Sequence, residues 1–282
     1  MNKTITSAFV LALCAFSGVA AAVPVSLNTW TAESYPAVSG FGAGVWTVSG
    51  DGSSVFQSVN GQPTLFYSDF TAFGTKVTGT INVTNAGGDD DYIGFALGFG
   101  AGDSTNASAD YLLVDWKRGT QSFEFGAPSS SPGGPAFAGL AVSRVTGIPD
   151  ADEFWQHANL SGTGAVSGLE ELARGSTLGN VGWGLATPYE FTFDFGPNNL
   201  QVFVNGVMEI DITGTFNDGY LAFYNFSQAG VTYSAFDLEE GSFPDPGDNG
   251  SGPVGVPEPG SIILFGMGLM GLGLLARRRK AV

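Results

Sequence analysis

The chain of 282 residues carries 26 acidic and 10 basic side chains, a formal net charge of −16. Residues 23–257 hold five of the basic and 25 of the acidic residues, so this span has a formal charge of −20 and is expected to repel nucleic acid and anionic lipid and to attract cations. A charged fraction of only 13% with 13% aromatic residues argues against disorder, and the span is long enough for one large all-β domain.

The first 22 residues have the composition of a secretory signal peptide. Lys3 provides the positive start, an apolar segment follows, and Ala20 and Ala22 provide the small residues of a cleavage site. We therefore predict that residues 1–22 are removed on export. The only cysteine, Cys14, lies in this segment, so the mature chain is expected to be held together by core burial without disulfides.

Short alternating or apolar runs, separated by turn residues, continue from residue 44 to residue 237. The predicted strands are Gly44–Ser49, Ser54–Ser58, Thr64–Tyr67, Lys76–Thr84, Tyr92–Phe99, Tyr111–Trp116, Gln121–Phe125, Gly139–Arg144, Tyr189–Phe195, Leu200–Val204, Val207–Thr213, Tyr220–Asn225 and Val231–Asp237. Many short strands with frequent turns predict an all-β antiparallel sandwich, a jelly roll, over residues 23–243.

The strongest local pattern is a hairpin. Asn205 and Gly206 stand between two alternating runs, and this pair fits a type I′ turn because both central residues need a positive φ. Two segments instead lack the strand pattern and are predicted to be loops, Gly126–Pro135 and Asp150–Arg174, the second with a helical turn near Asp152–Ala158. Residues 244–256, rich in Pro, Gly and Asp, are predicted to be a linker.

Three consecutive carboxylates, Asp89, Asp90 and Asp91, follow two glycines and precede a predicted strand. They repel one another unless a cation or solvent separates them, and calcium takes about six to eight oxygen ligands, including carbonyls that a glycine-rich loop presents. We predict a calcium site here, with Asn217 and Asp218 of a later turn as further ligands. The residues alone leave open a solvated turn with exposed acids, and Asn-Asp-Gly is also ordinary turn chemistry.

Several other chemically capable side chains are expected to have structural roles. Asp115 is expected to pair with Lys117, which lies on the same strand face. The single histidine, His157, is expected in a loop, which argues against a multi-histidine zinc site and a Ser-His-Asp arrangement. The tryptophans Trp116, Trp155 and Trp183 are expected in the core rather than stacked on sugar rings.

Glu209 and Asp211 offer an enzymatic alternative, because alternate residues of a strand share one face. They resemble the catalytic strand of jelly-roll glycosidases, but Gly214 stands where that pattern has a further acid. Retaining hydrolysis needs two carboxylates about 5–5.5 Å apart, whereas residues two apart on a strand lie ~7 Å apart at the backbone. We therefore predict that the domain is not an enzyme.

The C-terminal stretch has the pattern of a membrane anchor. Ser261–Ala276 carries no charge and rises about 24 Å as a helix, slightly short of the roughly 30 Å hydrocarbon core. Four basic residues, beginning with Arg277, Arg278 and Arg279, follow it and predict that this end stays cytoplasmic. The sequence therefore predicts a transmembrane helix over residues 261–276.

Pro257, Glu258 and Pro259, the helix and the arginines after it together resemble the PEP-CTERM sorting tail of exopolysaccharide-producing Gram-negative bacteria. The resemblance covers residues 257–282. It implies recognition by exosortase, a membrane transpeptidase, and removal of the tail near the Pro-Glu-Pro triplet. The protein is then expected to be anchored transiently in the inner membrane and delivered to the cell surface or extracellular matrix.

A second resemblance lies in the body of the chain. The segments Asp89–Phe95, Tyr111–Lys117, Gly119–Gln121, Gly139–Val145 and Phe223–Gln228 resemble, in this order, the thrombospondin C-terminal domain. The resemblance implies an L-type-lectin-like (concanavalin A-like) jelly roll that binds calcium and takes part in adhesion. The Asp-rich repeats and the cysteine pair of animal thrombospondins are missing, so their calcium load and receptor binding are not carried over.

These patterns together predict an exported, non-enzymatic domain that binds calcium and acts as an adhesive or carbohydrate-binding module. Its expected partners are exosortase and an extracellular polysaccharide or matrix component. Two alternatives stay open: a polysaccharide-active enzyme that uses Glu209 and Asp211, and a structural biofilm matrix protein without a specific ligand.

Overall fold

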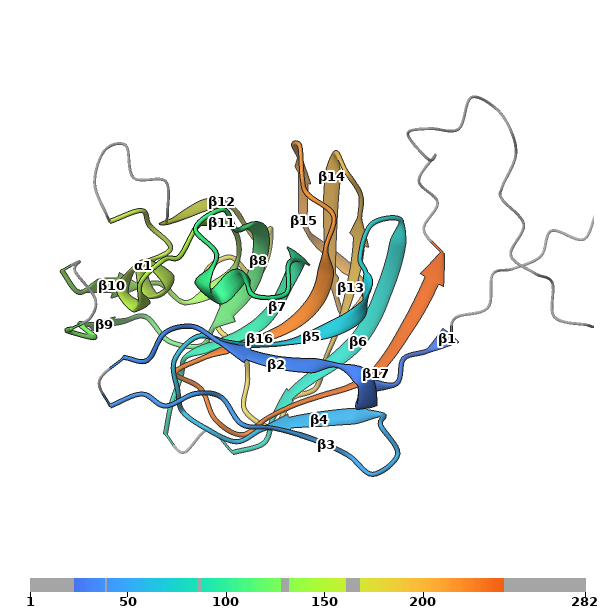
Figure 1. The fold of residues 1–282 in the computed structure, drawn as a ribbon, viewed down its shortest axis with the longest axis horizontal. Coiled ribbons are helices and arrows are strands. Elements are labelled where there is room, and N and C mark those ends of the chain that lie inside the picture. Colours follow the sequence, from blue (N-terminus) through green and yellow to red (C-terminus); the bar gives the residue numbers. More distant parts are fainter. Residues whose placement is uncertain (1–22, 39, 86–87, 128–131, 161–167, 241–282) are drawn as a thin grey trace, which may run out of the picture. The chain divides into compact units, whose positions relative to one another are not determined.

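The computed structural model describes residues 23–38, 40–85, 88–127, 132–160 and 168–240. The predicted signal peptide, linker, transmembrane helix and sorting tail lie outside these residues. Within the described part of the chain, no helix is long and apolar enough to cross a membrane. Two antiparallel sheets make up most of this part (Figure 1), and the predicted all-β antiparallel sandwich is confirmed.

The first sheet, sheet A, has the strand order β15-β14-β13-β6-β17-β4-β3, with β1 paired to β17. Its strands are β1 (Val23–Pro24), β3 (Trp46–Val48), β4 (Ser54–Gln57), β6 (Thr75–Val83), β13 (Tyr189–Phe195), β14 (Asn199–Val204), β15 (Val207–Thr213) and β17 (Val231–Glu240). At the predicted hairpin between β14 and β15, Asn205 and Gly206 have φ values of 49° and 76°. The turn therefore has the positive φ values that a type I′ hairpin requires.

The second sheet, sheet B, has the order β12-β11-β8-β7-β16-β5-β2. Its strands are β2 (Thr31–Ser34), β5 (Thr64–Thr71), β7 (Tyr92–Phe99), β8 (Asp110–Lys117), β11 (Gly139–Thr146), β12 (Gly168–Arg174) and β16 (Tyr220–Phe226). A separate two-stranded ribbon, β9 (Gln121–Phe123) with β10 (Gly134–Ala136), and the helix α1 (Ala151–Gln156) complete the fold, with 3-10 turns at Leu27–Thr29 and Asp103–Thr105.

The prediction of a loop over Asp150–Arg174 is partly wrong, because the last seven residues of this segment form β12. β12 has no β-branched or aromatic residue, so it lacks the local preference for a strand. It becomes a strand by pairing with β11. The helical turn is confirmed as α1, which begins with a capping box: the Glu153 backbone N–H donates to Asp150 Oδ1, and the Asp150 N–H donates to Glu153 Oε2, both at 2.9 Å.

The main core lies between the two sheets and is rich in aromatic rings. Phe95 of β7 is at its centre, with ring centroids of five neighbours between 4.6 and 6.0 Å away: Phe191, Phe193, Phe223, Tyr233 and Phe236. Most of these pairs are tilted or edge-to-face, which are favourable arrangements for aromatic quadrupoles. Burial of these rings joins sheet A to sheet B.

The other face of sheet B carries a second core. Tyr111 and Leu113 of β8 point to this side, where they pack in one cluster with Phe154 and Trp155 of α1 and Ala136 of β10. Figure 1 shows α1, β9 and β10 beside β8, β11 and β12. Because both faces of the sheet are covered, β7 and almost all of β8 are buried. Polar residues on the outer face of β8 are therefore buried and need partners there.

Candidate functional site

Lys117, the last residue of β8, lies in the second core with its side chain fully buried. Its Nζ is 2.5 Å from Asp91 Oδ1 and 3.6 Å from Asp90 Oδ1. The same ammonium lies 4.3 Å from the ring centroid of Trp155, a cation–π contact. Burial raises the pKa of Asp91, and the charge of Lys117 opposes this shift.

The predicted calcium ligands of this turn are oriented toward other partners. Asp89 Oδ2 accepts a hydrogen bond from Asn60 Nδ2 at 2.7 Å, and Asp91 pairs with Lys117. The Lys117 ammonium thus stands beside the carboxylates, where a metal ion would compete with it. In the described part of the chain, no three His, Cys, Asp or Glu side chains are grouped to hold a metal. A calcium site at this turn therefore stays a prediction, and ligation by Asp91 would have to compete with the Lys117 ammonium.

The other two predicted ligands, Asn217 and Asp218, lie at the opposite end of sheet B. In the register of β16 with β7, Tyr220 pairs with Phe99 and Phe226 with Tyr92. The turn before β16 is therefore separated from Asp91 by the length of β7, ~24 Å for an eight-residue strand. There Asn217 Nδ2 donates to Asp110 Oδ2 at 2.9 Å, and Asp218 Oδ1 accepts from the N–H of Gly219 at 2.8 Å. The structure does not bring the two predicted turns together.

The expectation that Glu209 and Asp211 share one face is wrong. The register shifts between Val202 and Phe203, which pair with Ile210 and Met208, so Glu209 occupies a bulge in β15. Its buried carboxylate accepts hydrogen bonds from the backbone N–H groups of Thr177 and Leu178 at 2.8 and 3.0 Å, whereas Asp211 is exposed. Burial alone would raise the pKa of Glu209, but hydrogen bonds from the Thr177 hydroxyl, from these two N–H groups and from the Ser176 hydroxyl lower it. Glu209 therefore anchors a loop.

The predicted pair of Asp115 and Lys117 is also wrong. Asp115 is fully buried, and its Oδ2 is 3.0 Å from Nε2 of His157. The two residues of β8 lie ~7 Å apart along the strand, whereas α1 packs on the outer face of sheet B and its C-cap residue is His157. His157 was expected in a loop, but it is 8% exposed and ends α1 in the left-handed conformation, with φ 52°.

A chain of alternating charges runs from the buried Asp115 toward the surface. His157 Nδ1 is 3.2 Å from Glu171 Oε2, and Arg174 donates to both oxygens of Glu171 through Nε and Nη2, at 2.8 and 2.7 Å. Burial alone would lower the pKa of His157, but Asp115 and Glu171 raise it to about 9. Burial would raise the pKa of Glu171, but its hydrogen bonds and charge pairing with His157 and Arg174 lower it to about 2. The histidine is therefore a cation at neutral pH.

An open depression lies over the outer end of this chain, and we call it the Phe137 groove. Its volume is ≈ 560 Å³. The side chains that line it include Thr120, Phe137, Gln156, Glu171, Arg174 and Asn180. Phe137, between β10 and β11, is 55% exposed. In contrast, the three tryptophans considered for sugar stacking are each 1% exposed, as expected of core residues.

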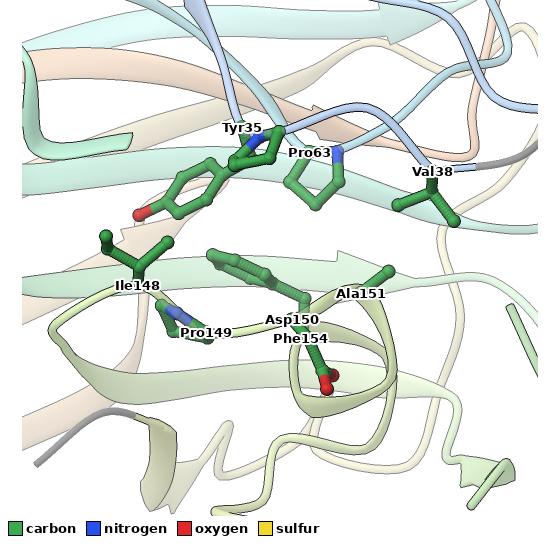
Figure 2. A pocket seen from close by; sticks show the side chains of 9 residues that line it. Tyr35, Val38, Pro63, Ile148, Pro149, Asp150, Ala151 and Phe154 are labelled. Carbon is green, nitrogen blue, oxygen red and sulfur yellow. The ribbon is translucent and has the colours of Figure 1, made fainter. Parts of the chain in front are cut away.

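A smaller hollow lies elsewhere on the second core, between the segment after β2 and the start of α1. Figure 2 shows Tyr35 and Pro63 on one side and Pro149 and Phe154 on the other. Its volume is ≈ 120 Å³, smaller than the ~150 Å³ apolar cavity that holds one benzene molecule. Asp150 on its rim is already engaged in capping α1. The larger and more polar Phe137 groove is therefore the candidate binding site.

The fold and the groove define a two-sheet antiparallel β-sandwich with an open, polar, ligand-sized depression outside its main core. The model of the thrombospondin C-terminal region matches residues 42–240, more than half of the chain, so the protein belongs to this family. The predicted resemblance is confirmed. The resemblance was expected to begin at Asp89, whereas the match already begins at residue 42. The PEP-CTERM protein-sorting motif is matched at residues 255–280. This motif implies export and exosortase processing.

The chain is similar to thrombospondin-3b of Danio rerio, with 29% identity over 200 residues, 67% of this chain and 20% of the relative. It thus spans about a fifth of the length of that relative. Among solved structures, a carbohydrate-binding module CBM66 from Bacillus subtilis has 8% identity and a TM-score of 0.44, with 70% of this chain and 91% of the module covered. The exoplasmic/lumenal domain of VIP36 in its Ca2+/Man-bound form has 12% identity and a TM-score of 0.44, with coverages of 77% and 85%.

Proposed function

We propose that the protein is an exported module of the bacterial cell surface or extracellular matrix that binds carbohydrate through the Phe137 groove. Residues 1–22 direct export, and Pro257, Glu258, Pro259 and the arginines after residue 276 direct sorting and processing of the tail. The tail anchors the chain in the inner membrane until exosortase removes it. Membership in the thrombospondin C-terminal family supports an adhesive role, and the sorting motif supports the location.

The observation that carries the proposal is the combination of size and rigidity in the Phe137 groove. Its volume of ≈ 560 Å³ lies within the range of ligand-binding clefts, about 300–1,000 Å³. The bidentate contact between Arg174 and Glu171 and the contact of Glu171 with His157 hold the polar floor in one geometry. A preformed site loses less conformational entropy on binding than a mobile one.

The proposed carbohydrate binding does not depend on calcium, because the Lys117 ammonium already lies against the Asp89–Asp91 turn. A calcium ion at that turn remains a prediction, which requires displacement of this ammonium. Glu209 is no nucleophile in the proposal, since its carboxylate is occupied by the loop N–H groups of Thr177 and Leu178.

A glycan array probed with residues 23–243 tests the function. This unit is suitable because the compact unit ends at Phe243 and contains both sheets and both cores. We expect retention of a subset of glycans, in the presence of calcium and in excess chelator alike. If no glycan is retained in either condition, carbohydrate binding is excluded. Location is tested separately: the full chain should reach the surface fraction, and a chain lacking residues 257–282 should not be anchored.

A further inference from the structure

We infer that the Phe137 groove selects uncharged sugars, with the apolar face of one sugar ring on Phe137 and its hydroxyls on the Glu171–Arg174 pair. This inference rests on the proposed carbohydrate binding and names the ligand class and the contacts. Three features of the groove carry it: its charge balance, the exposed ring of Phe137 on a tethered backbone and the hydrogen-bonding capacity of the floor.

The charges of the groove cancel in pairs. Arg174 is paired with Glu171, and the protonated His157 is paired with the buried Asp115. No excess positive charge therefore attracts a carboxylate or sulfate group of a ligand. The surrounding span has a formal charge of −20, which repels polyanions over the range of a Debye length. An uncharged polar ligand is the class that this balance favours.

The backbone beside Phe137 is tethered through the next residue in the chain. The N–H of Ala138 donates to Thr120 Oγ1 at 3.0 Å, and the carbonyl of Ala138 accepts from Arg174 Nη1 at 3.1 Å. Both polar groups of this residue are thus tied to side chains of the groove, which fixes the backbone next to Phe137. The ring itself is more than half exposed although the domain has two aromatic cores that bury most of its rings. An exposed ring on a tethered backbone suits stacking against the C–H face of a sugar.

The floor presents a donor beside an acceptor. Arg174 has five N–H groups, and four are directed to Glu171, Ala138 and Gly179, which leaves one on Nη2. Glu171 Oε1 accepts one hydrogen bond from Arg174 Nε and has a second lone pair. An adjacent donor and acceptor match two neighbouring hydroxyls of a sugar ring. Asn180, also on the wall of the groove, adds an amide with both kinds of group.

The test compares Phe137→Ala with a matched control, Phe56→Ala. Phe56 is 39% exposed and lies on β4 in sheet A, away from the Phe137 groove. Residues 23–243 are run in native gels that contain a neutral glucan, a neutral galactomannan or a polyuronate, at 0.15 M salt. A neutral polysaccharide should retard the unaltered domain, and the polyuronate should not. Phe137→Ala should weaken binding by at least about tenfold, the scale of a central interface residue, and Phe56→Ala should leave it unchanged.

A second variant, Thr120→Val, removes the hydroxyl that holds Ala138 but leaves the ring present. It should weaken binding in the unaltered domain and have no further effect in the Phe137→Ala background, because both changes act on one ring. Additive losses, equal binding by Phe137→Ala and the unaltered domain, or a preference for the polyuronate would each overturn the inference. If the array shows glycan binding while Phe137→Ala binds normally, only the inference fails. If the array retains no glycan, the proposed function itself fails.

Discussion

Raising the pH from 6.5 to 9.5 is expected to destabilise the domain, because His157 then loses a proton that the folded state holds tightly. The pKa of His157 is raised from 6.5 to about 9 in the folded chain. A raised pKa contributes stability that is fully present below the unfolded value and is lost as the pH rises through the folded value. The window of this effect is therefore pH 6.5 to about 9.

The size of the effect follows from the shift. A difference of ~2.5 pKa units at about 1.4 kcal/mol per unit corresponds to about 3 kcal/mol of unfolding free energy. For a domain of this size the melting temperature should fall by about 6–12 °C. The side chains that face His157 are Asp115 from β8, Glu171 from β12 and Tyr92 from β7. Burial also raises the pKa of Asp115. This carboxyl therefore lowers the free energy of unfolding as the pH rises, as His157 does, but its effect begins near pH 4.

Urea unfolding of residues 23–243 at constant ionic strength, followed by tryptophan fluorescence between pH 6 and 9.5, measures the effect. The control is His157→Gln, which cannot titrate in this range. This variant should be less stable than the parent at pH 6.5, because Asp115 loses its cation, and should lack the loss of stability that deprotonation of His157 causes between pH 6.5 and about 9. A parent profile that is flat between pH 6.5 and 9, or an equal slope in both proteins, would refute the proposed charge on His157.

Three further substitutions test individual contacts by urea unfolding. Lys117→Met should lower the free energy of unfolding by about 3–5 kcal/mol, because it leaves Asp91 buried without its cation. Adding Asp91→Asn should restore most of this loss. A cost below about 1 kcal/mol would contradict the buried pair. Asn205→Ala should cost about 1 kcal/mol at its positive φ, whereas Asn205→Gly should be tolerated; equal stabilities of the two would argue against the type I′ turn. Glu209→Ala should lower the free energy of unfolding by about 1–3 kcal/mol, because the N–H groups of Thr177 and Leu178 lose their acceptor. Asp211→Ala, at an exposed position, should change it by less than about 0.5 kcal/mol. Similar costs for both variants would exclude the anchoring role of Glu209.

Local sequence patterns were sufficient to predict most strands of the sandwich. The predicted bounds of Tyr92–Phe99, Tyr189–Phe195 and Val207–Thr213 match β7, β13 and β15. These runs have the apolar, aromatic or alternating composition that favours a strand without help from distant residues. β12 was missed for the opposite reason. Its Glu, Leu and Ala residues have no local preference for a strand, and only the pairing with β11 makes them one.

The candidate site was predicted less well than the fold. Asp115 was recognised as a residue that needs a partner, but the partner assigned to it, Lys117, was wrong, whereas the calcium ligation predicted for Asp91 stays a prediction. The correct one for Asp115 is His157, 42 positions along the chain. An acid inside an apolar strand signals that a cation must be near, and the single histidine was the remaining signal in the sequence. The Phe137 groove had no signal at all, because its lining comes from α1, from β12 and from loops that are brought together only in the folded chain.

The sequence by itself determined most of the strand pattern, the turn at Asn205 and Gly206, the sorting motif and the family, because each depends on neighbouring residues or on the order of short segments along the chain. Only the tertiary structure decided which charges meet. The outer face of β8 would be solvated in an ordinary two-layer sandwich, and its acid and lysine would then need no partners. Coverage by α1 and the β9–β10 ribbon removes water from that face, and each buried charge must then be neutralised by whatever side chain the covering layer or the adjoining loops bring to it.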